Sequence, residues 1–285
     1  MTKNDARLGA PLTNAERREQ ARQQAQQNRI AAQRKRRSQR VAAVTILALA
    51  LTGLVTALVV TFLQQRDGDA AKFPEARPTV GGVVLPRAAD PVHGGVPVSA
   101  AGTGVAAEDG VTVHVFLDAM CPYCGIFDRV NGADLEELAQ EEGVTVVYHP
   151  VAALDELSRG TAYSTRAANA AGLIADQAPE HFTAFLSALF AEGTQPQENT
   201  PGLSDDGIAD LARSVGVDDD VVARFTEQGD QGRTFAGWAA AGISQIPPNE
   251  EGKPVTPTVT IDGVRWTENF TVPGALRAAV EAARG

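Results

Sequence analysis

The second half of the chain alternates short apolar runs with longer amphipathic stretches. Four runs have the length and the period-2 pattern of β-strands. They cover residues 111–117, 144–148, 258–261 and 264–266. The last two flank Asp262-Gly263, a dipeptide typical of a two-residue hairpin turn. In the Gly/Pro-rich segment before them, residues 83–85 and 96–98 predict short edge strands.

Apolar positions with helical spacing fill most of the remaining sequence. The predicted helices cover roughly residues 122–142, 160–176, 180–192, 204–215, 218–228, 231–242 and 273–284. Ser204 and Asp218 are suitable N-caps for two of them. Strand, helix, strand, several helices, a hairpin and a last helix predict an α/β core with a helical insertion at about 156–245. We expect Phe182, Phe185, Leu186, Leu189 and Phe190 to form the core of this insertion.

A different pattern precedes this domain, because residues 41–63 are consecutive uncharged and mostly apolar positions. At about 1.5 Å per residue, a helix of this length crosses the ~30 Å hydrocarbon core of a membrane. A buried core helix rarely runs so long without a charge. A cleavable signal peptide has an apolar stretch of about 7–15 residues and a small-residue cleavage site. Here the polar residues 64–67 follow, so we expect one uncleaved transmembrane anchor.

The charge distribution predicts how this anchor is oriented. Residues 1–40 carry 11 Lys/Arg and 3 Asp/Glu, and the rest of the chain holds 14 of the 25 Lys/Arg and 32 of the 35 Asp/Glu. The positive-inside rule places the basic tail in the cytoplasm and everything after the membrane outside it. The tail suits anionic headgroups better than nucleic acid. We expect a linker at 64–79 and one acidic domain at 80–285, unsuited to binding polyanions.

The only two cysteines, Cys121 and Cys124, directly follow the first of the strongly predicted strands. A helix that begins at Cys121 offers its free N–H groups and dipole to the sulfur, which lowers a thiol pKa from about 8.5 to roughly 3.5–7.5. Cys124, one turn later, is near enough to form a disulfide or to resolve a mixed one. We therefore expect Cys121 to be the exposed nucleophile and Cys124 the shielded resolving thiol.

Two other uses of the cysteine pair are a zinc site and a structural disulfide. Zinc needs about four ligands, and the chain adds only four histidines to the two cysteines. The pattern therefore favours redox chemistry and predicts no metal. A structural disulfide would resist reductants of glutathione strength, whereas a catalytic one exchanges quickly.

Three stretches of the chain resemble the DsbA-like thiol-disulfide oxidoreductases, which have the thioredoxin fold. Residues 116–124 (FLDAMCPYC) are similar to the family's strand and Cys-Pro-x-Cys active site. Residues 162–171 with 189–190 resemble the inserted helical subdomain, and residues 255–263 resemble the cis-proline loop and hairpin. The resemblance spans about residues 106–285.

The resemblance implies which residues form the active site, and the sequence differs from the family at one of these positions. It implies a cis Thr256–Pro257 bond facing the sulfurs, where substrate backbone pairs, and a redox-active disulfide with no other cofactor. The family's buried acid is replaced by Val115, so Asp118, or less plausibly His114, would handle the proton.

The dipeptide between the cysteines, Pro122-Tyr123, differs from the Pro-His of the strongest oxidases of the family. Histidine stabilises a thiolate by charge and hydrogen bonding, whereas tyrosine offers only its hydroxyl and ring. A less extreme reduction potential is therefore expected. His114 and His149 are expected to be strand residues with local partners.

The resemblance also implies a function. We expect a membrane-anchored extracytoplasmic oxidase that acts on secreted or envelope proteins. A membrane quinone-linked partner, of the DsbB or vitamin-K-epoxide-reductase type, would reoxidise it. The alternatives are an isomerase or reductase of the same fold, and a tethered binding domain whose disulfide is structural.

Overall fold

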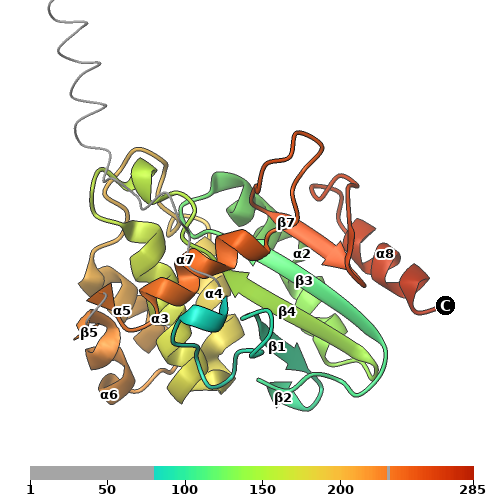
Figure 1. The fold of residues 1–285 in the computed structure, drawn as a ribbon, viewed down its shortest axis with the longest axis horizontal. Helices are drawn as coiled ribbons and strands as arrows, with labels where there is room; N and C mark the ends of the chain where they lie inside the picture. Colours follow the sequence, from blue (N-terminus) through green and yellow to red (C-terminus); the bar gives the residue numbers. More distant parts are fainter. Residues whose placement is uncertain (1–79, 230–231) are drawn as a thin grey trace, which may run out of the picture. The chain divides into compact units, whose positions relative to one another are not determined.

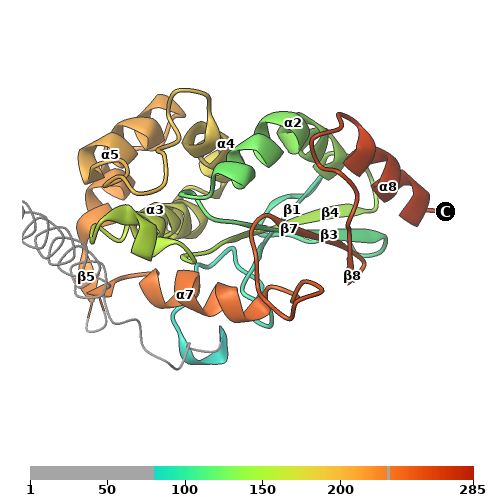
Figure 2. The ribbon, with the colours of Figure 1, turned by 90° about the horizontal axis from the view of Figure 1, so that it is seen from above.

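The computed structural model describes residues 80–229 and 232–285. Its main sheet has six strands in the order β2-β1-β4-β3-β7-β8. The strands are β1 (Val96–Ser99), β2 (Gly102–Thr103), β3 (Val111–Leu117), β4 (Val144–Pro150), β7 (Thr258–Ile261) and β8 (Val264–Arg265). A separate small hairpin consists of β5 (Gln228–Gly229) and β6 (Gly232–Arg233). In Figure 2, α2 and α8 lie on one face of the main sheet and α7 lies on the other.

The parallel pair β3 and β4 forms the centre of the sheet, while β7 runs antiparallel to β3 and β1 runs antiparallel to β4. All seven residues of β4 are buried. Because both faces of these central strands are covered, the runs are nearly continuously apolar rather than strictly alternating. Figure 1 shows β3 and β4 side by side between β1 and β7.

The helices flank and interrupt this sheet. The α-helices are α2 (Pro122–Ala139), α3 (Tyr163–Gln177), α4 (Phe182–Phe190), α5 (Asp205–Ser214), α6 (Asp219–Val222), α7 (Ala236–Gln245) and α8 (Ala275–Ala283). Short 3-10 helices are η1 (Val80–Gly82), η2 (Asp155–Ser158), η3 (Pro179–His181) and η4 (Ala223–Thr226). Helices α3 to α7 all lie between β4 and β7 in the sequence and form a helical insertion into the α/β core.

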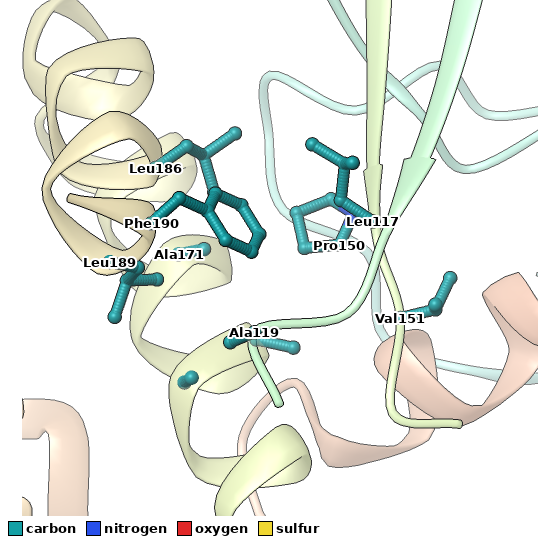
Figure 3. Close-up of a pocket in the computed structure, with 10 residues that line it drawn as sticks. Leu117, Ala119, Pro150, Val151, Ala171, Leu186, Leu189 and Phe190 are labelled. Carbon is teal, nitrogen blue, oxygen red and sulfur yellow. The ribbon is translucent and has the colours of Figure 1, made fainter. Parts of the chain in front are cut away.

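The insertion packs closely against the sheet. A small cavity of ≈ 10 Å³ lies where they meet (Figure 3). Its walls come from Leu117 and Pro150 at the ends of β3 and β4, and from Leu186, Leu189 and Phe190 of α4. A space of this size holds at most about one water molecule, and an apolar lining offers that water no partners. The insertion and the sheet therefore share one continuous apolar core.

The predicted fold class is confirmed as a thioredoxin-like α/β architecture with helices inserted before the final hairpin. The strands predicted at 111–117 and 258–261 have those bounds, and β4 is two residues longer than predicted. At the Asp262-Gly263 turn both residues have positive φ, 49° and 80°, as a two-residue hairpin of the primed type requires. The five apolar residues expected to form the core of the insertion are all buried.

Three predictions of local structure are wrong. Residues 83–85 form no strand. The chain passes over the core there as a loop, which leaves Val84 65% exposed. Strand β1 is not an edge strand, since β2 pairs with its outer side. The helix predicted at 218–228 is only the four-residue α6 followed by η4.

Of the two predicted N-caps, one makes a capping hydrogen bond and the other does not. Ser204 caps α5 as predicted, since its hydroxyl accepts a hydrogen bond from the Gly207 N–H at 3.1 Å. Asp218 occupies the N-cap position of α6, but its side chain makes no capping hydrogen bond.

The predicted anchor, tail and linker lie in residues 1–79, outside the described residues. Within residues 80–229 and 232–285, no helix combines the length and apolar character needed to span a membrane.

Candidate active site

The central strand β3 leads directly to the cysteine pair. After a short turn, Cys121 occupies the N-cap position of α2 in an extended conformation, with φ −76° and ψ 115°. Pro122 follows at the first helical position, where its fixed φ suits the helix and its missing N–H costs nothing. No side chain caps this helix end. The free N–H groups and the positive end of the helix dipole therefore act on the Cys121 sulfur.

Both cysteines are free thiols and both are buried. The Cys121 thiol donates to the Thr256 carbonyl oxygen with a sulfur–oxygen distance of 3.4 Å. The Cys124 sulfur accepts a hydrogen bond from the Asp118 N–H at 3.5 Å. Cys124 is fully buried, as expected, but Cys121 is only 4% exposed. The prediction of an exposed Cys121 is therefore wrong, because the loop that carries Thr256 covers its sulfur.

The two thiols have opposite pKa shifts. The hydrogen bond from the Cys124 thiol lowers the pKa of Cys121 to about 7 against the opposing effect of burial, and the side chain of Thr256 makes a smaller contribution. Burial raises the pKa of Cys124 well above its usual value, and its hydrogen bond and proximity to Cys121 add to this. Near pH 7, about half of Cys121 is therefore thiolate, whereas Cys124 keeps its proton.

Asp118 lies directly beneath the cysteine pair and is fully buried. One carboxylate oxygen accepts from the Met120 N–H at 2.8 Å and from the Ser164 hydroxyl at 2.7 Å. The other accepts from the N–H groups of Ala153 and Leu154, at 2.7 and 2.9 Å. Burial raises the pKa of Asp118 to about 6, although these four hydrogen bonds oppose the shift. Asp118 is thus a buried acid whose backbone N–H contacts the resolving cysteine.

The Thr256–Pro257 peptide bond is cis, as predicted. Pro257 directly precedes β7, and the Thr256 carbonyl faces the Cys121 sulfur. The expected neighbours of the redox pair are therefore brought together across 135 residues of sequence.

The dipeptide between the cysteines points outward. Pro122 is exposed, and Tyr123 has 61% of its surface accessible to solvent. The aromatic ring of Tyr123 is thus available to a protein that approaches the pair.

His114 and His149 lie on adjacent strands away from the sulfurs. Their ring nitrogens Nδ1 and Nε2 are 2.9 Å apart, and the His149 ring stacks on Phe116 with ring centroids 4.1 Å apart. Burial lowers the pKa of both histidines. They have local partners, and neither forms a hydrogen bond with the cysteines among the described residues. Within those residues, no cluster of three or more His, Cys, Asp or Glu side chains is arranged to bind a metal ion.

One residue at the site has no counterpart in the sequence-based prediction. The side chain of Gln195, from the loop after α4, donates to the Cys121 carbonyl oxygen at 2.7 Å. A glutamine in a polar loop 74 residues from its partner carries no motif or periodicity that reveals this contact.

Comparison with known proteins agrees with this site. A model of the family described as "Thioredoxin" matches residues 106–282. Among curated proteins, the serine/threonine-protein kinase PknE of Mycobacterium tuberculosis is 33% identical over 143 residues. That match covers 46% of this chain but only 25% of the kinase, so the chain spans about a quarter of the length of these relatives.

Solved structures give a longer match. The oxidised form of M. tuberculosis DsbA is 28% identical, with a TM-score of 0.56, and the match covers 67% of this chain and 93% of that one. The reduced disulfide bond oxidoreductase DsbG of the same organism is also 28% identical, with a TM-score of 0.55 and coverage of 67% and 88%. MdbA of Actinomyces oris, at 16% identity and a TM-score of 0.53 over 76% and 96%, supports the fold alone.

The family match, the structural similarity and the arrangement of Cys121, Cys124 and the cis-proline loop agree with one another. The chain belongs to the thioredoxin family, and its fold is similar to that of the disulfide oxidoreductases DsbA and DsbG.

Proposed function

We propose that the protein is a membrane-anchored, extracytoplasmic dithiol oxidase that introduces disulfides into secreted or envelope proteins. The difference between its two thiols supports thiol–disulfide exchange, and the predicted extracytoplasmic location favours oxidation over reduction. The pKa of Cys121 is lowered to about 7, whereas that of Cys124 is raised. Stabilising the thiolate stabilises the reduced enzyme, and this makes its disulfide a better oxidant.

The reaction starts from the Cys121–Cys124 disulfide. A substrate thiolate attacks the Cys121 sulfur, the bond between the two cysteines breaks, and Cys124 leaves with the electron pair and takes up a proton. A second substrate thiol then loses its proton and attacks the substrate sulfur of the mixed disulfide. Cys121 leaves as the thiolate that the helix end stabilises. The substrate loses two electrons and the enzyme gains them.

Asp118 would handle the proton of Cys124. Its backbone N–H holds the Cys124 sulfur, and its carboxyl has a pKa of about 6. A group with this pKa exchanges protons readily near neutral pH. It would fill the role for which the sequence has Val115 at the usual position of the family.

The acceptor of the two electrons would be a membrane quinone-linked protein of the DsbB or vitamin-K-epoxide-reductase type. The substrate backbone would lie along Thr256 and Pro257, beside the exposed Tyr123. The uncharged segment 41–63 and the basic tail before it support an anchor with a cytoplasmic N-terminus.

The activity is tested with the purified, oxidised protein and a reduced, unfolded protein whose native state contains disulfides. The wild type should convert substrate thiols to disulfides stoichiometrically, and Cys121→Ser should reduce the rate to background. A double serine variant that still oxidises the substrate would refute the proposal. If none of the variants changes the activity and only the binding of a partner is observed, the protein is the tethered binding domain with a structural disulfide.

The redox state of the pair in cells separates oxidase from isomerase or reductase. Trapping free thiols with acid and an alkylating agent should find the pair mostly oxidised, whereas a mostly reduced pair would favour the isomerase or reductase. Protease added to intact cells should degrade the domain and leave the basic tail. A mature form that starts after residue 64 would identify the apolar run as a signal peptide.

A further inference from the structure

Gln195 links the helical insertion to the reactive end of α2. It lies in the loop after α4, and its side-chain amide nitrogen is 2.7 Å from the Cys121 carbonyl oxygen and 3.4 Å from that of Ala119. The shorter contact is at the tight end of the range for N–H···O hydrogen bonds. The turn that contains Gln195 is itself fixed, because its backbone N–H donates to the Ala191 carbonyl at 3.2 Å. The insertion therefore holds the backbone of the nucleophilic cysteine directly.

The helix has a gap shaped for this side chain. A Cβ atom placed on Gly125 would lie 1.8 Å from the Gln195 side-chain oxygen, which no real structure allows. Gly125 has ordinary helical φ, so the backbone itself does not require glycine there. Glycine is otherwise unfavourable inside a helix. The absence of a side chain at Gly125 thus makes room for the Gln195 carboxamide, directly after Cys124.

Hydrogen bonds to the Cys121 carbonyl oxygen can fix the position of the Cys121 peptide. It also accepts hydrogen bonds from the N–H groups of Cys124 at 3.0 Å and Gly125 at 3.3 Å, as the N-cap carbonyl of α2. With Gln195 as a third donor, the orientation of the Cys121 peptide is fixed, and with it the position of the Cα–Cβ bond that carries the sulfur. The donor also places partial positive charge next to the reactive end of the helix.

We propose that Gln195 is a positioning residue of the thiol–disulfide reaction, which fixes the Cys121 peptide so that its sulfur stays at the helix end as a thiolate. The consequence for turnover rests on the proposed oxidase function. The orientation of the sulfur does not, and it can be measured on the reduced protein without any substrate.

The first test compares Gln195→Ala with Gln197→Ala. Gln197 lies in the same loop, and its exposed side chain makes no hydrogen bond among the described residues. The rate of Cys121 alkylation by iodoacetamide is measured from about pH 5 to 9 on the reduced protein. Since one pKa unit is a tenfold change in thiolate at low pH, Gln195→Ala should alkylate about three- to tenfold more slowly near pH 6. Gln197→Ala should match the wild type.

Gln195→Glu sharpens this test because it keeps the shape of the side chain. Its carboxylate cannot donate to the carbonyl and adds a negative charge near the sulfur, so the alkylation profile should move further toward alkaline pH than in Gln195→Ala. A residue with a merely structural role would lower thermal stability and leave the pH profile in place. An unchanged profile in both folded variants overturns the proposal.

Gly125→Ala tests the fit between the two residues. In the wild-type background the new methyl group should displace the Gln195 side chain and reproduce the alkylation profile of Gln195→Ala. In the Gln195→Ala background the same change should have little further effect, because the remaining close atom is the tip of the flexible Arg129 side chain, 2.8 Å away. Equal effects of Gly125→Ala in both backgrounds would contradict the proposed contact.

Oxidation of a reduced test protein gives the last readout. If the wild type oxidises it and Gln195→Ala does so more slowly, both proposals stand. If the wild type fails to oxidise it while the alkylation profile still depends on Gln195, the oxidase proposal fails and the positioning role remains.

Discussion

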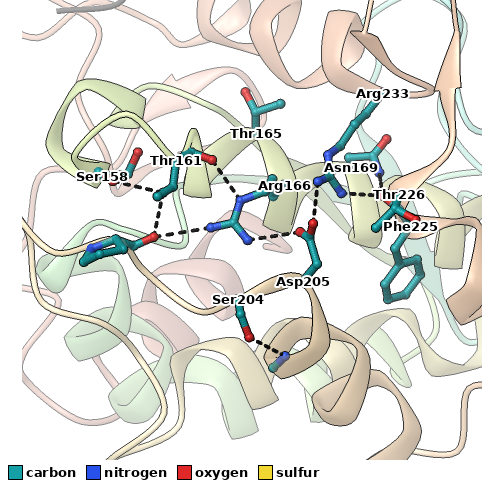
Figure 4. A network of polar contacts seen from close by, with 12 residues as sticks. Ser158, Thr161, Thr165, Arg166, Asn169, Ser204, Asp205, Phe225, Thr226 and Arg233 are labelled. Atoms are coloured by element: carbon teal, nitrogen blue, oxygen red, sulfur yellow. Dashed lines mark hydrogen bonds and ion pairs between the residues drawn. The ribbon is translucent and has the colours of Figure 1, made fainter. Parts of the chain in front are cut away.

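Two polar clusters of this protein, the cysteine site and a network in the helical insertion, shift the pKa of a carboxyl group in opposite directions. In the insertion, the carboxylate of Asp205 in α5 forms ion pairs with the guanidinium groups of Arg166 at 3.1 Å and Arg233 at 2.8 Å (Figure 4). Burial opposes ionisation of Asp205, but the two guanidinium groups hold its pKa below the usual range. At the cysteine site, the four donors to Asp118 are uncharged, and burial raises its pKa to about 6.

The network joins four parts of the insertion. Arg166 also donates to the Thr161 carbonyl at 2.9 Å, and Arg233 donates to the Phe225 carbonyl at 2.6 Å. Asn169 adds a bond to the same Phe225 carbonyl and accepts from the Phe235 N–H. Every charge has an opposite charge or a backbone oxygen beside it, so the cluster fixes structure. The cysteine site leaves its acid and its thiols without a countercharge, and the pKa values of Asp118 and Cys121, about 6 and about 7, lie near neutral pH.

The largest expected effect comes from removing the resolving thiol. Cys124→Ser should stop oxidation, because the variant cannot form the Cys121–Cys124 disulfide. When its Cys121 thiolate attacks a disulfide of an oxidised substrate, one substrate thiolate leaves and the substrate stays attached to Cys121, because the enzyme has no resolving thiol. Non-reducing gels of the reduced variant incubated with a disulfide-containing substrate should show this adduct, and Cys121→Ser should show none. Adducts that form on Cys124 in Cys121→Ser instead would reverse the assignment of the two cysteines.

A difference in reactivity between the thiols should appear with pH. The folded-state pKa of Cys121, about 7, lies below the ordinary value of a thiol, so its thiolate persists above pH 7 and is lost as the pH falls below it. Its alkylation rate should be half-maximal near pH 7 and fall about tenfold per unit below it. Mass spectrometry after brief labelling near pH 6 should find the label on Cys121. Equal labelling of Cys124 would contradict the asymmetry.

Asp205→Ala should have the opposite profile, a loss of stability without a change in redox chemistry. It leaves Arg166 and Arg233 largely buried without their countercharge. Since Asp205 is itself partly exposed, we expect a loss of about 2 kcal/mol, less than for a fully buried pair. Thermal unfolding should show a Tm lower by roughly 4–8 °C.

Asp206→Ala is the matched control for this variant. Asp206 is the next residue in the first turn of α5 and is exposed. It should lower the Tm far less than Asp205→Ala. A changed pH profile of Cys121 alkylation in Asp205→Ala would show that the two clusters are coupled.

The smallest expected effect comes from giving the cysteine site a weak cation. Tyr123→His places an imidazole between the cysteines at an exposed position, where solvent screens its charge. Its partial charge near neutral pH should lower the pKa of Cys121 by up to about one unit, which corresponds to a rise of roughly 30 mV in reduction potential. Equilibration with glutathione buffers measures this shift. Tyr123→Phe, which adds no charge, should leave the potential close to that of the wild type.

Features encoded locally were predictable from the sequence. The strand at 111–117, the Asp262-Gly263 turn and the helix that begins at the cysteines each depend on residues close together in the chain. The cis bond at Pro257 was predictable only through resemblance to a family.

Features that depend on distant contacts were not predictable. Cys121 is covered by Thr256 from 135 residues away, and Gln195 meets it from 74 residues away. Neither contact alters the local hydrophobic pattern. The strand predicted at residues 83–85 is absent for a related reason. An apolar tripeptide forms a strand only where another strand has a free edge to pair with, and this edge is supplied by a distant part of the chain.

The position of the helical insertion in the topology has a consequence for evolution and engineering. The chain leaves the sheet at β4 and returns at β7, and these two strands flank β3, which leads to Cys121. Exchanging the insertion between relatives would therefore keep the registers that hold β3 on both sides, and it would keep the contacts of the redox centre where the new insertion retains Ser164 and Gln195. Variation in substrate preference can accumulate elsewhere in α3 to α7 while these two residues keep the contacts of the redox centre.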